Sequence, residues 1–70
     1  MPEHYRRRIT ELIIVLENEP VPAKLYDTLK MEPSDNTYRI RIGDIRVVYE
    51  VRWTIGQIEI MKIEWRGRAY

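Results

Sequence analysis

The sequence contains no cysteine, no phenylalanine, three glycines and a single histidine, His4, among its 70 residues. A chain without cysteine has no disulfide framework, which is usual for cytoplasmic proteins. A single histidine near the start cannot form a metal-binding motif, and it has no cysteine or recognisable serine motif with which to form a catalytic nucleophile and general base. No Gly-rich phosphate loop is present either. We therefore expect a cytoplasmic protein that uses no metal and no cofactor and is neither a triad hydrolase nor a metal-dependent one.

Long hydrophobic runs are also missing. The longest, Leu12 to Leu16, is far shorter than the ~20 residues that cross a membrane, and no secretion signal precedes it. We expect no membrane association and one small domain covering residues 1–70. Because the core of so short a chain seldom contributes more than ~3–5 kcal/mol, we also expect a protein partner or a homodimer.

Charge is unevenly distributed, although the formal net charge is only +1. Residues 9–36 carry two basic and six acidic side chains, whereas residues 37–70 carry seven basic and four acidic ones. Nine of the twelve basic residues are arginine, whose planar fork binds phosphate and stacks on bases. The second half of the chain is therefore a candidate nucleic-acid-binding surface.

Hydrophobic spacing predicts an α+β fold. Apolar residues recur with a helical period from Tyr5 to Leu16, which predicts an amphipathic helix over about 3–18. An irregular connection follows over 19–37, and alternating or β-branched stretches predict strands at about 38–43, 45–53 and 57–65. The expected architecture is this helix packed on an antiparallel sheet of three strands, or of more by association.

Strand register gathers arginines on one face. If Gly43 and Asp44 form a two-residue hairpin loop, Arg41 lies opposite Arg46, and Arg39 shares their face. Opposed like charges are destabilising, so we expect something anionic to compensate them. Centring the next loop on residues 55–56 places Trp65 beside Arg46, where the indole could stack a base or, alternatively, cover a second small core.

The residues just described carry a family resemblance. The stretch from Tyr38 to Val51 (YRIRIGDIRVVYEV), followed by 65–70 (WRGRAY), resembles RelE toxins of type II toxin–antitoxin systems, and residues 4–8 and 19–22 resemble the archaeal branch. The resemblance implies a RelE/ParE-like fold and ribosome-dependent mRNA cleavage by basic residues without a metal. It also implies a RelB-like antitoxin as partner. Members of the family open with a strand and a helix that have no counterpart before Met1.

Family roles carry over by position. The resemblance implies that Arg39 and Arg46 bind phosphate, that Arg41 activates the ribose 2′-hydroxyl, and that Arg66 protonates the leaving group or stabilises its charge. Tyr70 would stack or orient a base. RNA contacts are further expected at Arg39, Arg68 and Trp65.

Two other functions fit the same sequence. A shortened RelE-like domain could be non-catalytic and act by binding an antitoxin or a copy of itself. A ParE-like gyrase inhibitor shares the fold, but closely spaced arginines fit RNA chemistry better.

Overall fold

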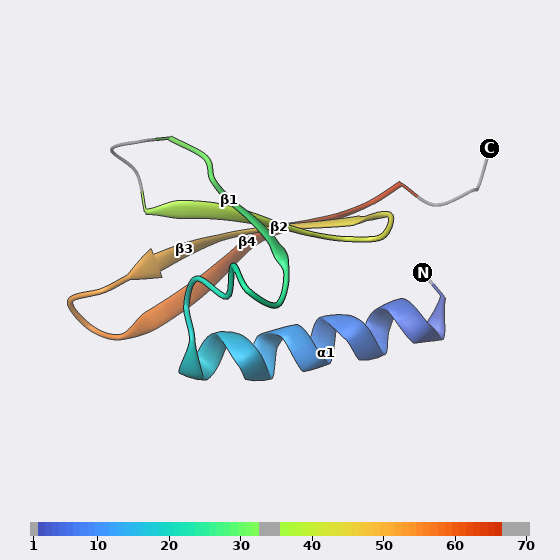
Figure 1. Ribbon diagram of the computed structural model, residues 1–70, viewed down its shortest axis with the longest axis horizontal. Helices are drawn as coiled ribbons and strands as arrows, with labels where there is room; N and C mark the ends of the chain where they lie inside the picture. Colours follow the sequence, from blue (N-terminus) through green and yellow to red (C-terminus); the bar gives the residue numbers. More distant parts are fainter. Residues whose placement is uncertain (1, 33–35, 67–70) are drawn as a thin grey trace.

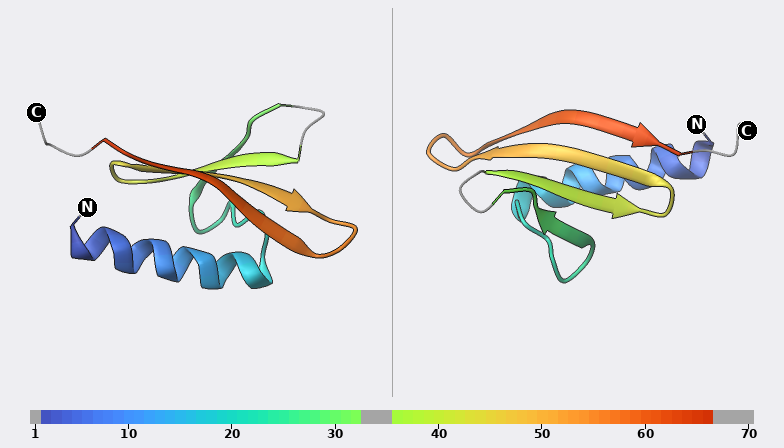
Figure 2. Two further views of the ribbon diagram at one scale, coloured as in Figure 1. Left: turned by 180° about the vertical axis from the view of Figure 1, so that it is seen from behind. Right: turned by 90° about the horizontal axis from the view of Figure 1, so that it is seen from above.

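One helix and a four-stranded antiparallel sheet make up the computed structural model, which describes residues 2–32 and 36–66. Helix α1 spans Glu3–Asn18, and the strands are β1 (Asp27–Lys30), β2 (Thr37–Ile42), β3 (Ile45–Arg52) and β4 (Gln57–Trp65). The strands lie in the sheet in chain order, and α1 runs along one side of it (Figures 1 and 2). We call this the helix side and the opposite side the outer face. The predicted helix on an antiparallel sheet is confirmed.

The core lies between the helix and the two central strands. Leu12 and Leu16 of α1 are 0% and 2% exposed, and they pack with buried residues of β2 and β3, which are Tyr38, Ile40, Ile42, Ile45, Val47, Tyr49 and Val51. The hydroxyl of Tyr49 donates a 2.7 Å hydrogen bond to the carbonyl of Pro20, just after the helix. The helix end is thereby fixed against the middle of β3.

A fourth strand lies where the sequence predicted only an irregular connection over 19–37. That prediction was wrong, because β1 pairs along its whole length with β2, with Asp27 opposite Arg41 and Leu29 opposite Arg39. The four residues of β1 have no alternating pattern of their own. Their strand conformation comes from the hydrogen-bonding edge that β2 offers, which is a tertiary effect.

The register between β2 and β3 is the predicted one. Ile42 lies opposite Ile45 and Arg41 opposite Arg46. Gly43 makes the tight turn possible with a φ of 55°, a value that side chains with a Cβ rarely adopt. A Cβ at this position would lie 3.2 Å from the ring of Tyr5, so the helix start packs closely on the hairpin.

The predicted register between β3 and β4 was wrong. Glu64, and not Trp65, lies opposite Arg46, and Trp65 lies opposite Ile45. Two features cause the shift. The turn between the strands occupies four residues, 53–56, and a β-bulge between Val48 and Tyr49 changes the alignment along β4.

No helix in the part of the chain that the structure describes is long and apolar enough to cross a membrane.

Candidate anion-binding site

Three of the four predicted catalytic residues meet at one end of the sheet. Arg41, Arg46 and Arg66 line a shallow pocket of about 210 Å³ together with Gly43, Asp44 and Ile45. The first two are brought together by the β2–β3 register. The third is brought there by the main chain, because the N–H of Arg66 donates a 2.9 Å hydrogen bond to the carbonyl of Asp44 in the hairpin turn. The fourth predicted catalytic residue, Tyr70, lies outside the described residues, as does Arg68.

Carboxylates flank this arginine pocket from both neighbouring strands. Asp27 of β1 lies 3.9 Å from the Nε of Arg41, and Glu64 of β4 lies 3.7 Å from Arg46. The expected anionic compensation therefore exists within the chain. The side chains in these pairs are 43–59% exposed, so each pair contributes at most about 1 kcal/mol and can exchange for a stronger anion.

Arg39 occupies a different environment from the other arginines. It is 9% exposed, lies in register between Leu29 of β1 and Val48 of β3, and places its Nη2 3.7 Å from Asp27. Its Nη1 is buried and has no hydrogen-bond partner among the described residues. A guanidinium this enclosed is poorly placed to meet an RNA phosphate directly. It instead holds the carboxylate of Asp27, which also faces Arg41.

Trp65 does not join the arginines. Opposite residues of an antiparallel pair share a face, and Ile45 belongs to the core, so Trp65 points to the helix side and is 38% exposed. The expected stacking platform beside Arg46 is therefore absent from the described outer face, and the position is occupied by Glu64.

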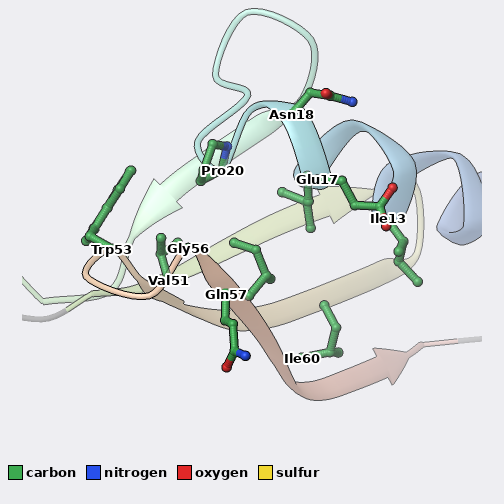
Figure 3. Close-up of a pocket in the computed structure, with 11 residues that line it drawn as sticks. Ile13, Glu17, Asn18, Pro20, Val51, Trp53, Gly56, Gln57 and Ile60 are labelled. Atoms are coloured by element: carbon green, nitrogen blue, oxygen red, sulfur yellow. The ribbon is translucent and has the colours of Figure 1, made fainter.

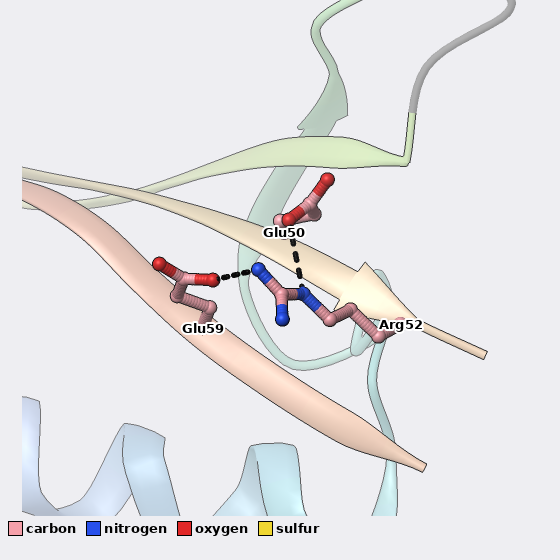
Figure 4. A network of polar contacts seen from close by, with 3 residues as sticks. All are labelled: Glu50, Arg52 and Glu59. Atoms are coloured by element: carbon pink, nitrogen blue, oxygen red, sulfur yellow. Dashed lines mark hydrogen bonds and ion pairs between the residues drawn. The ribbon is translucent and has the colours of Figure 1, made fainter. Parts of the chain in front are cut away.

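A fourth arginine on the outer face has its own partners. Arg52, at the far end of β3, pairs with Glu50 and Glu59 (Figure 4). Both carboxylates contact a single guanidinium, so this end of the face is acidic on balance. Arg52 thus provides an internal comparison for the arginine pocket, with the same residue type in the same sheet but already neutralised.

Sequence reasoning missed Asp27, because it was placed in an irregular segment. The dense turn-forming sequence at 32–36 could have shown a hairpin between 27–30 and 37–42 and so revealed it. No group of three or more histidine, cysteine or acidic residues that could hold a metal occurs within residues 2–32 and 36–66. Chemically, a pocket lined by three arginines is suited to binding a phosphate.

No protein-family model matches the chain, but individual proteins of known sequence or structure are similar to it. A Methanocaldococcus jannaschii protein named as a RelE1 toxin is 39% identical over 70 residues, which are 100% of this chain and 78% of that protein. An archaeal RelE–RelB complex from Pyrococcus horikoshii OT3 contains a chain that superposes with a TM-score of 0.85 at 42% identity, covering 99% of this chain and 81% of that one.

A second solved complex, the RelB–RelE antitoxin–toxin complex from Methanococcus jannaschii, superposes with a TM-score of 0.75 at 29% identity over 94% of this chain and 75% of that one. Sequence and fold thus agree along nearly the whole molecule. With 39% identity over its full length and the fold of two solved relatives, the chain belongs to the RelE toxin family.

Proposed function

We propose that this toxin is a ribosome-dependent endoribonuclease that cleaves mRNA without a metal, with the arginine pocket as its active site. The observation that carries the proposal is the convergence of Arg41, Arg46 and Arg66 on one pocket from three separate parts of the chain. Guanidinium groups fixed before the substrate arrives stabilise the charge that develops on a phosphoryl group during cleavage.

In this reaction the ribose 2′-hydroxyl gives up its proton to solvent water and its oxygen attacks the adjacent phosphorus, which forms a 2′,3′-cyclic phosphate as the bond from phosphorus to the 5′-oxygen of the next nucleotide breaks. Arg46 holds the scissile phosphate, Arg41 stabilises the 2′-oxygen as it loses its proton, and Arg66 stabilises or protonates the leaving oxygen. Arginine remains protonated at neutral pH, so these roles are electrostatic or proton-donating. Tyr70 is proposed to stack on or orient a base.

Arg39 has a positioning role in this scheme. Its buried guanidinium fixes Asp27, and Asp27 in turn faces Arg41 across the β1–β2 pair. An incoming phosphate then competes with Asp27 for Arg41. The carboxylate orients the arginine while the site is empty and leaves it available when RNA binds.

We further propose a RelB-like antitoxin as the partner in the cell. Support comes from the two solved relatives, which are described as RelE–RelB complexes and match this chain over 99% and 94% of its length. An antitoxin that covers the arginine pocket with acidic side chains would neutralise the toxin by occupying its phosphate site.

Expression in cells with mapping of mRNA 5′ ends on translating ribosomes tests the enzymatic proposal. Codon-phased cuts are expected from the wild type, and Arg46→Ala should abolish them. Arg52→Ala is the matched control, because that arginine is held by two carboxylates away from the pocket. Absence of cuts with the wild type would favour a non-catalytic binding module, and DNA breaks with intact mRNA would favour gyrase inhibition.

A binding measurement separates recognition from cleavage. Titration of single-stranded RNA at several salt concentrations should show that Arg46→Ala weakens binding and reduces the salt slope by about 0.7, the value for one lost phosphate contact on a single strand. Arg52→Ala should leave the slope close to that of the wild type. An unchanged slope for Arg46→Ala would remove Arg46 from the proposed site.

A further inference from the structure

A hydrophobic groove lies on the helix side, between the second half of α1 and strand β4. Its volume is about 520 Å³, and its walls include Ile13 and Leu16 from the helix and Ile58 and Ile60 from β4 (Figure 3). The helix covers β2 and β3, whose inward side chains are buried, but it covers β4 only in part, because Ile58 and Ile60 are half-buried against the core and most of the rest of the strand is exposed. Farther along β4, Ile63 and Trp65 remain 42% and 38% exposed. The groove therefore continues as an apolar strip along this strand.

The flank of α1 beside the groove carries a regular pattern of charge. Arg6, Thr10, Ile13 and Glu17 are spaced by four, three and four residues, which places them in one stripe along the helix. Figure 3 shows Ile13 and Glu17 at the groove, so the stripe borders it. The stripe is basic at its start, acidic at its end and apolar near its middle, and its members are exposed.

We propose that the groove is the interface for a second copy of this chain, whose own α1 lies antiparallel against this stripe. In that arrangement Arg6 faces the partner's Glu17, and Thr10 faces the partner's Ile13. Two-fold symmetry repeats each contact, so one helix pair forms two ion pairs and two apolar contacts. A parallel arrangement would instead place Arg6 on the partner's Arg6 and Glu17 on the partner's Glu17, which charge repulsion disfavours.

The interface also covers the surface that the fold leaves open. The partner's helix would lie over the exposed part of the inner side of β4, where it removes Ile63 and Trp65 from water as well as Ile13. Within one copy of the chain Arg6 forms an ion pair with Glu3, at 3.8 Å, and both side chains are about 70% exposed. That weak contact exchanges readily for a pair with Glu17 across the interface.

Charge reversal tests the proposal through the oligomeric state of the full chain, measured by sedimentation velocity from low to high micromolar concentration. The wild type should dimerise. Arg6→Glu and Glu17→Arg should each raise the dissociation constant by about tenfold, because two ion pairs become two repulsions, and the double reversal should restore it. Glu11→Arg, on the other flank of α1, should have little effect. Both stripe reversals suit the helix dipole, so the variants should remain folded.

Cross-linking gives a second, independent readout, since the chain has no cysteine of its own. Thr10→Cys places one thiol near the proposed two-fold axis, and a short bismaleimide should join two copies there but not through Glu11→Cys. A wild type that stays monomeric at every concentration would overturn the proposal. A dimer whose dissociation constant is unchanged by both charge reversals would also overturn it, as would an equal cross-linking yield from Thr10→Cys and Glu11→Cys.

Discussion

The buried hydroxyl of Tyr49 allows a quantitative prediction about pH and stability. The side chain is 0% exposed, its ring stacks on Tyr38 at a centroid distance of 5.8 Å, and its hydroxyl donates to Pro20 at 2.7 Å. Burial, and secondarily the nearby Tyr38, raises the pKa of Tyr49 from 10.0 to about 12. The folded protein therefore keeps a proton on Tyr49 at pH values where the unfolded chain has lost it.

The sign of the effect follows from this proton. Below pH 10 both states are protonated and the contribution of Tyr49 is complete. As the pH rises from 10 to 12 the unfolded state ionises first, so the free energy of unfolding falls by up to about 3 kcal/mol. Tyr49→Phe removes the titration and also the hydrogen bond to Pro20, which costs about 1–2 kcal/mol at neutral pH.

Urea unfolding of the wild type and Tyr49→Phe at steps from pH 8 to pH 12 measures both quantities. The wild type should be more stable at pH 8, and its advantage should shrink and then reverse as the pH approaches 12. Taking the difference between the two proteins cancels the other tyrosines and lysines. A difference that stays constant over this range would show that Tyr49 does not hold its proton more tightly in the folded state.

Three further predictions concern the arginine pocket and the hairpin beside it. Arg66→Ala should abolish cleavage and barely change the melting temperature, because its side chain is exposed and its main-chain hydrogen bond to Asp44 is kept. Full activity would assign it to surface charge. Asp27→Asn should lower the melting temperature, because it removes the ion-pair partner of the buried Arg39 guanidinium. It should also tighten RNA binding in a filter assay, because phosphate no longer competes with Asp27 for Arg41. Weaker RNA binding would contradict this competition. Gly43→Ala should lower the free energy of unfolding by about 1–3 kcal/mol, and by more than Gly56→Ala does. Both glycines have a positive φ, but only a Cβ at position 43 would lie against Tyr5. Equal losses of unfolding free energy in chemical denaturation would exclude that contact.

Sequence reasoning succeeded where local rules fix the geometry. A two-residue loop at Gly43 and Asp44 allows essentially one register, and the alternation of apolar residues selects which face is buried. The pairing of Arg41 with Arg46 follows from these two constraints alone. Because that pairing forms the centre of the candidate site, the position of the site was predictable from local sequence.

Reasoning failed where pairing depends on the partner strand. The four residues of β1 have little intrinsic strand preference, and they form a strand because β2 has an unpaired edge beside them. The β3–β4 register depends on the length of the turn and on the bulge near Tyr49, neither of which has a distinctive sequence signal. An error of one residue there exchanges the two faces, which is why Trp65 was assigned to the wrong one.

The bulge between Val48 and Tyr49 makes the edge of β4 less suited to pairing with a strand of another molecule. A flat edge strand with exposed isoleucines invites another strand to add on, and repeated addition leads to fibres. The bulge bends β4, and Lys62 places a charge on the same strand, while the opposite edge, β1, is only four residues long. Both edges thus discourage backbone pairing between molecules. The protein therefore associates with other molecules through side-chain surfaces. Such surfaces fit a limited number of partners, and the complexes that they form can dissociate.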